Sequence, residues 1–179
     1  MRYMKNWIYF LIAWMLYMVI HEGIHLIAAL TYGEYHSILV QWYGPQAIFN
    51  TPVAEREGVM WGFISSTPNL ITLALGYTLF LLRVKIKELK KDLAHFLEYV
   101  IIIFMLADAL NLSLAPFVFG GDINGIVAGF GINRYLIQFF FLVILLVNRE
   151  LIAQKLLPEF GIKTNHFLFR KWIHLNLNK

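Results

Sequence analysis

Residues 7–30 read WIYFLIAWMLYMVIHEGIHLIAAL, an apolar run that is long enough to cross a bilayer as one helix. Glu22 is the only charged residue in this run. Ionisable side chains at membrane depth are energetically costly, and as a rule they mark functional sites. The run therefore predicts a transmembrane helix that carries a functional group in its second half.

His21 and His25 flank Glu22 in the pattern His-Glu-x-x-His. Residues four apart share one face of a helix, so both imidazoles can bind one Zn²⁺ while Glu22 acts as general base on a zinc-bound water. We therefore expect a zinc hydrolase that works inside a bilayer. The alternative is a chance match, in which the two histidines only form hydrogen bonds to neighbouring helices.

The composition is that of a membrane protein. Of the 179 residues, 59% are hydrophobic and only 15% are charged, whereas a soluble domain carries about 25% charged residues. Cysteine is absent, so His and carboxylate side chains must hold any metal. The net charge of +4 is explained by where the basic residues lie, and we expect no nucleic-acid partner.

The apolar runs predict an all-α membrane protein with about four transmembrane helices. The runs are Trp7–Leu30, Gly58–Leu82, Phe96–Pro116 and about Ile132–Val147. All Lys and Arg residues except Arg56 and Arg134 fall at the N-terminus, between the second and third runs, or in the C-terminal tail. By the positive-inside rule, this is a multi-pass protein with both termini cytoplasmic, which we expect in the cell membrane.

The chain divides into an intramembrane core, residues 1–148, and a cytoplasmic tail, residues 149–179. The apolar, aromatic and basic residues of the tail suit an amphipathic helix on the lipid surface, and a solvated tail is the alternative. Residues 35–50 indicate a short hairpin or re-entrant loop, whose strand edge would bind a peptide by strand addition. For this loop the alternative is an interfacial aromatic anchor.

Catalytic zinc usually has three protein ligands and one open position. Asp122 and Asp108 are the candidates for the third ligand, because Asp92 belongs to the basic cytoplasmic loop. Asp122 follows two glycines, in a turn that either bends its carboxylate back towards the site or caps the next helix. At a rise of ~1.5 Å per residue, Asp108 falls near the depth of His21, so it could also be the third ligand. The alternative to a ligand role is a buried acid that bonds to Asn111 or to a histidine ring.

Two sequence elements resemble motifs of a known family. The first consists of His21, Glu22 and His25, followed by Ala29 and Gly33; the second is an Asn-x-x-Pro…Asp-Gly element, matched by Asn111, Pro116 and Asp122. These elements resemble those of the site-2 protease family of intramembrane zinc metalloproteases. The resemblance implies that Asp122 is the third ligand. The gap from Asn to Asp is longer here, and Ile123 stands where Gly is usual, which leaves Asp108 as the alternative.

The resemblance also implies a membrane-embedded zinc metalloendopeptidase. It would hydrolyse peptide bonds in or near transmembrane segments, so its partners would be the lipid bilayer and a membrane-protein substrate with a transmembrane helix. Such a helix must unwind before cleavage, and Asn69 and Asn111 are candidates to bind its freed backbone, with interhelical bonding as the alternative. The competing hypothesis is a non-proteolytic membrane protein that binds or transports a divalent metal, in which Glu22 has no base role.

Overall fold

The computed structural model describes residues 2–41 and 44–173, and it is 72% helical. The long helices are α1 (Arg2–Tyr32), α2 (Val59–Leu81), α4 (Lys91–Ser113) and α6 (Arg134–Leu151). Shorter helical elements are Val53–Glu55, α3 (Arg83–Lys87), Ala115–Phe117, α5 (Asp122–Phe130), the π-helical turn Ile152–Leu156 and α7 (Leu157–Glu159). Two strands, β1 (Tyr35–Gln41) and β2 (Gly44–Phe49), complete the fold.

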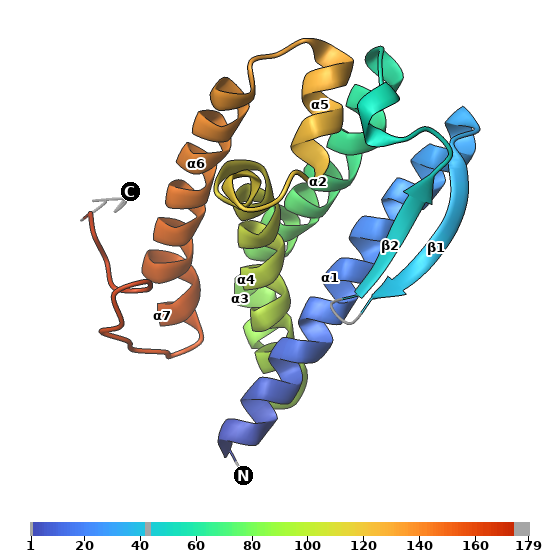
Figure 1. Cartoon of the computed structure of the whole chain (residues 1–179). Helices are drawn as coiled ribbons and strands as arrows, with labels where there is room; N and C mark the ends of the chain where they lie inside the picture. The colour runs from blue at the N-terminus through green and yellow to red at the C-terminus, as the bar shows by residue number, and fades with distance from the viewer. Residues whose placement is uncertain (1, 42–43, 174–179) are drawn as a thin grey trace.

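Four helical segments are long and apolar enough to span a membrane: Met4–Tyr32, Val59–Leu81, Lys91–Phe117 and Arg134–Glu159. This confirms the predicted number of such helices. The central one is α4, which packs against α1, α2 and α6 (Figure 1). Because the fold also contains a small sheet, it is mostly helical rather than purely helical.

The expected hairpin forms between α1 and α2. β1 and β2 pair antiparallel, with Ile38 opposite Ala47, and β2 is the strand that packs more extensively on α1. The pair runs along α1 on the side away from α6 (Figure 1). Residues 42–43, at the tip of the expected hairpin, lie outside the described residues.

The fourth helix is longer than the sequence suggested, because Arg149 and Glu150 do not end it. The two side chains are buried and form an ion pair with each other, so their charges are neutralised within the fold. The helix continues through the π-helical turn to Glu159. The surface helix expected in the tail is not formed in residues 160–173, which adopt turns and irregular structure, and residues 174–179 lie outside the described part of the chain. The division of the chain after residue 148 stays a prediction.

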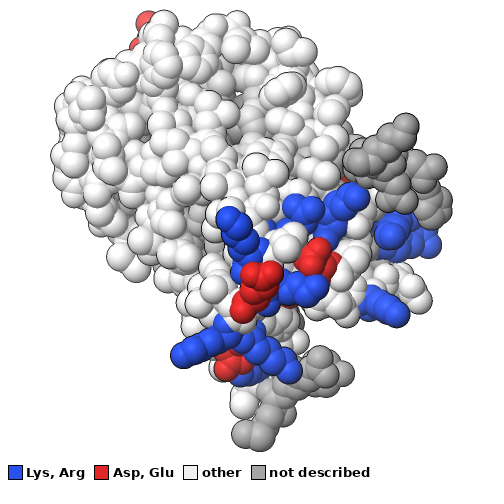
Figure 2. All heavy atoms as spheres, turned by 180° about the vertical axis from the view of Figure 1, so that it is seen from behind, with Lys and Arg blue, Asp and Glu red and all other residues white. Residues whose placement is uncertain are grey.

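Two ion pairs place several helix ends at the same end of the molecule. Lys5 of α1 contacts Asp92 of α4 at 2.6 Å, and Lys87 of α3 contacts Glu159 of α7 at 2.8 Å. Most Lys and Arg residues on the face shown in Figure 2 gather at one end, while most of that face is uncharged. We call this the basic end. The candidate site lies farther along α1, beyond its midpoint.

Candidate metal centre

The two motif histidines lie in the second half of α1, and each is only 5% exposed. Their ring centroids are 5.0 Å apart. Nε2 of His21 lies 3.3 Å from Oδ2 of Asp122, and Nε2 of His25 lies 3.1 Å from Oδ1 of the same carboxylate. The helical spacing thus places both imidazoles on one side of α1, and the fold brings Asp122 to both of them.

Asp122 reaches this position because a sharp turn precedes α5. Gly121 has a φ of +64°, a backbone conformation that glycine adopts without strain, and Asp122 is the first residue of the helix. Its carboxylate therefore sits at a helix N-terminus, where the helix dipole favours negative charge. α5 packs so closely on α2 that a Cβ atom on Gly129 would overlap the backbone of Gly62. This close packing fixes the position of α5, and with it that of Asp122.

Two asparagines hold the Asp122 carboxylate. Nδ2 of Asn69 in α2 donates to Oδ2 over 2.9 Å, and Nδ2 of Asn111 in α4 donates to the same oxygen over 3.0 Å. Burial opposes ionisation of this carboxyl, but His25 and His21 beside it hold the pKa of Asp122 well below its usual range. The asparagines therefore orient an ionised carboxylate towards the histidines. Their role in binding a substrate stays a prediction.

Asp108 lies on the opposite side of His21 and is fully buried. Its Oδ1 atom is 3.1 Å from Nδ1 of His21 and accepts a hydrogen bond from the Tyr17 hydroxyl over 2.6 Å. Its Oδ2 atom accepts a hydrogen bond from the Thr72 hydroxyl over 2.5 Å. Because the Tyr17 hydroxyl donates to Asp108, its oxygen is left to accept the Nδ1 proton of His21, 3.3 Å away. Both contacts hold Nδ1 of His21 on the side of Asp108, so that Nε2 is the ring nitrogen that faces Asp122.

The structure thus separates the two aspartates by position. Asp122 faces Nε2 of both histidines, whereas Asp108 contacts the other ring nitrogen of His21 alone. The contacts of Tyr17 and Thr72 with Asp108 were not foreseen from the sequence. Tyr17 precedes His21 by four residues, so the helical period already placed the two on one face. No comparable signal pointed to Thr72.

Glu22 lies beside the histidine pair and is half-buried. One ligand atom each from His21, Glu22 and His25 lies within 4.8 Å of the other two. Oε2 of Glu22 accepts the backbone N–H of Ala47 in β2 over 2.8 Å. Ala47 therefore uses its N–H for Glu22, so β2 contacts the carboxylate of the candidate base directly.

The Nδ1 side of the His25 ring differs from that of His21, because no acidic partner meets it within the described residues. Nδ1 of His25 is buried and makes no hydrogen bond within the described residues. Its ring packs edge-on against Phe49, at 6.0 Å between centroids, and Phe49 packs in turn against Trp61. The guanidinium of Arg56 covers the Phe49 ring at 4.9 Å. This aromatic layer shields one flank of the site from water.

The donor types at this site are ones that divalent metal ions accept. Ligand atoms at about 2.0–2.1 Å from a tetrahedral zinc stand roughly 3.3 Å from one another. The histidine Nε2 atoms lie 3.3 and 3.1 Å from the two different oxygens of Asp122, distances that are also those of hydrogen bonds. Two imidazoles and one carboxylate are also a common ligand set of catalytic zinc, with one position open. Among the described residues, His21, Glu22 and His25 form a group that can bind a metal ion, and their donor types do not fix which metal.

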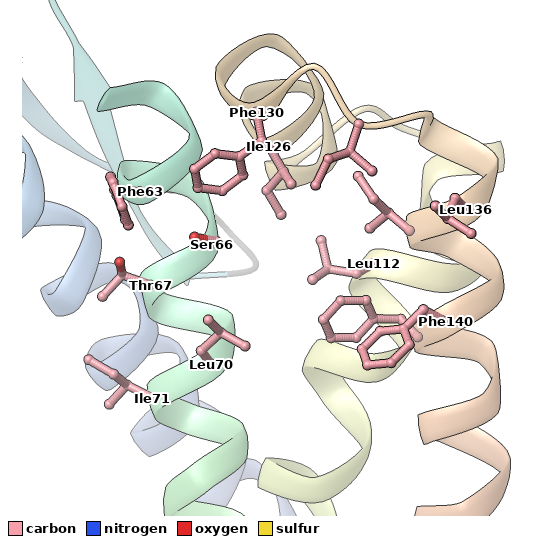
Figure 3. A pocket seen from close by; sticks show the side chains of 13 residues that line it. Phe63, Ser66, Thr67, Leu70, Ile71, Leu112, Ile126, Phe130, Leu136 and Phe140 are labelled. Atoms are coloured by element: carbon pink, nitrogen blue, oxygen red, sulfur yellow. The ribbon is translucent and has the colours of Figure 1, made fainter. Parts of the chain in front are cut away.

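A separate apolar groove of about 760 Å³ lies between α2 and α6, with α5 across one end (Figure 3). Side chains such as Phe63, Leu70 and Phe140 form its walls. A large pocket is the usual first choice for a binding site. This one, however, is lined by no titratable side chain and by no residue of the candidate metal centre. We therefore place the chemistry at the histidine pair.

Comparisons with protein-family models, with curated proteins and with solved structures found no match for this chain. The resemblance to the site-2 protease family therefore stays a prediction that rests on the motifs. What the fold and the site define is a protein with four potential membrane-spanning helices and a buried His-Glu-His group that can bind a metal ion.

Proposed function

We propose that the protein is an intramembrane zinc metalloprotease that hydrolyses peptide bonds in or near transmembrane segments of other membrane proteins. The observation that carries the proposal is the convergence of His21, His25 and Asp122, from two distant parts of the chain, beside the carboxylate of Glu22. In a chance match, the contacts of both Nε2 atoms with Asp122 would be hydrogen bonds alone, and the protein would bind no zinc.

The proposal includes a position in the membrane. The four apolar helices cross the bilayer, and the basic end faces the cytoplasm by the positive-inside rule. Both chain termini are then cytoplasmic, and the metal centre lies in the outer part of the bilayer of the cell membrane. The buried and aromatic surroundings of the histidines suit a site with restricted access to water.

His21, His25 and Asp122 would hold the metal. When bound, Zn²⁺ would act as a Lewis acid and lower the pKa of a water molecule to about 7. Glu22 takes a proton from the attacking water at its carboxylate and returns it to the leaving nitrogen. Asp108 and Tyr17 keep the proton of His21 on Nδ1, so that Nε2 stays available as a ligand.

The hairpin offers the substrate a place to bind. Ala47 N–H contacts Glu22 on the edge of β2 that does not pair with β1, so an extended peptide added to this edge would run past the base. A transmembrane helix must unwind locally to expose a peptide bond, and strand addition would satisfy part of its freed backbone. The substrate class is therefore a membrane-protein segment that can become extended.

The test compares wild type with Glu22→Gln and with Glu57→Gln, which replaces an exposed glutamate outside the site. Each purified protein is reconstituted with cell membranes, and newly formed peptide N-termini are identified by mass spectrometry. We expect new ends in or near transmembrane segments with wild type and Glu57→Gln. For Glu22→Gln we expect about 10²–10⁴-fold slower cleavage, with zinc still bound.

Cleavage by Glu22→Gln at the wild-type rate would remove the proposed base and contradict the protease mechanism. The same variant addresses the competing hypothesis of a divalent-metal binding or transport protein. If Glu22→Gln retains metal uptake into vesicles and no variant produces new peptide ends, the metal is the cargo and the protease proposal is wrong.

A further inference from the structure

The C-terminal segment Phe167–Ile173 is folded back against α6 by one buried ion pair. Nε of Arg149 donates to the carbonyl of Leu168 over 2.7 Å, and its Nη2 donates to the carbonyls of Phe167 and Arg170. The guanidinium also lies 3.8 Å from the ring centroid of Trp172. We call Phe167–Ile173 the clamped segment.

Glu150 completes this clamp. Its Oε1 accepts a hydrogen bond from the backbone N–H of Trp172 over 3.1 Å, and its Oε2 accepts one from the Gln154 side-chain amide over 2.6 Å. The same Gln154 amide also donates to the carbonyl of Ile173. The hydrogen bonds from Arg149, Glu150 and Gln154 to the clamped segment are therefore made to its backbone, while the Phe169 side chain packs against the core and the Trp172 ring lies against Arg149.

The side chains that the clamp presents are apolar and exposed. Phe167 and Ile173 each leave 59% of their surface exposed, and Leu168 and Trp172 leave 52% and 45%. Four large apolar side chains in seven residues would be unfavourable in contact with water. The clamped segment therefore suits a place where an apolar phase meets it.

Two basic side chains accompany these apolar ones. Arg170 and Lys171 are exposed, and with Phe167 and Trp172 they line a shallow hollow of about 550 Å³. The Arg170 guanidinium lies 5.5 Å from the Phe167 ring centroid. The hollow thus combines two positive charges with two aromatic rings, the combination found where membrane proteins meet lipid headgroups.

We propose that the hollow of the clamped segment binds the headgroup of an anionic phospholipid, with Leu168 and Ile173 in contact with its acyl region. The inference rests on the proposed membrane position of the chain, and it does not depend on the protease chemistry. An acidic soluble protein would match the charge of Arg170 and Lys171, but it would leave the apolar side chains in water. A lipid satisfies both features.

The experiment titrates the purified full-length protein in neutral detergent with phosphatidylglycerol or phosphatidylcholine, and native mass spectrometry counts the bound lipids. Arg170→Gln/Lys171→Gln removes the two charges of the hollow and leaves the backbone carbonyls of the clamp. The matched control, Lys85→Gln/Lys90→Gln, removes two exposed charges elsewhere at the basic end. A third variant, Arg170→Lys/Lys171→Arg, keeps the charge and reports on folding of the segment.

We expect wild type to prefer phosphatidylglycerol, and Arg170→Gln/Lys171→Gln to bind it about thirty-fold more weakly, since each basic residue contributes roughly fivefold. The control and the charge-keeping variant should bind it as wild type does. Equal losses in both Gln variants, or no preference over phosphatidylcholine, would overturn the proposal. Displacement of the lipid by inorganic phosphate alone would identify a free-anion site, and the lipid assignment would then be wrong.

Discussion

Asp108→Asn is the substitution that best separates an ordered metal centre from a loose group of polar residues. The Asp108 carboxylate lies 3.1 Å from Nδ1 of His21 and accepts hydrogen bonds from Tyr17 and Thr72. Asn has nearly the same size but only one acceptor oxygen, and its NH₂ group faces donors. The Tyr17 and Thr72 hydroxyls can rotate to adapt, whereas the Nδ1 proton of His21 cannot.

We expect that Asp108→Asn weakens the hydrogen bond that keeps the His21 ring in the tautomer that can bind a metal. Loss of an outer partner of a ligating histidine typically costs 10–100-fold in metal affinity. We therefore predict that Asp108→Asn raises the dissociation constant for Zn²⁺ by 10–100-fold, or about 1.4–2.7 kcal/mol. Metal-free protein is titrated with Zn²⁺ against a competing chelator, so the measurement needs no substrate.

The control is Glu98→Gln, which changes another buried acid of the same helix. Glu98 contacts His95 at 2.9 Å and, within the described part of the chain, forms no ion pair or hydrogen bond with the metal centre. This variant should bind Zn²⁺ as wild type does. If Asp108→Asn also binds Zn²⁺ with wild-type affinity, Asp108 does not position His21, and the reasoning from its contacts is refuted.

Three further predictions concern the metal and the packing around it. Asp122→Ala should weaken Zn²⁺ binding more than Asp108→Asn does in the same titration, because it removes a proposed ligand; equal effects would contradict that order. Zn²⁺ at 100 times its dissociation constant should raise the free energy of unfolding by about 2.7 kcal/mol, measured by chemical denaturation in detergent, and no change would argue against a site in the folded state. Gly129→Ala should lower this free energy by about 1–3 kcal/mol, because its Cβ meets the backbone of Gly62. Gly23→Ala, whose Cβ meets nothing within 4 Å, should leave stability unchanged or slightly raised, and equal losses in both alanine variants would contradict the packing argument.

The long helices and the histidine pair were predictable because both depend on local patterns. A run such as Trp7–Leu30 is long enough to span a bilayer, and the spacing of His21 and His25 follows from the helical period. The hairpin was predictable from the apolar and aromatic residues that precede a Gly-Pro pair. None of these inferences required knowledge of how the helices pack.

The choice between Asp108 and Asp122 was not predictable, because depth along a helix says nothing about rotation around its axis. Only the packing of α4 against α1 shows that Asp108 meets Nδ1 of His21, on the side away from Asp122. The extension of the fourth helix was missed for a related reason. Arg149 reads as a polar helix end until the structure shows its ion pair with Glu150 and its bonds to the clamped segment.

X-ray absorption spectroscopy of the zinc-loaded protein tests the central claim most directly, because it reports the ligand atoms themselves. For wild type we predict one zinc per chain, with two imidazole nitrogens and carboxylate oxygen at about 2.0–2.2 Å. In Asp122→Ala the carboxylate contribution should disappear. A wild-type spectrum without two imidazole ligands, or an identical spectrum for wild type and Asp122→Ala, would contradict a metal centre built from His21, His25 and Asp122.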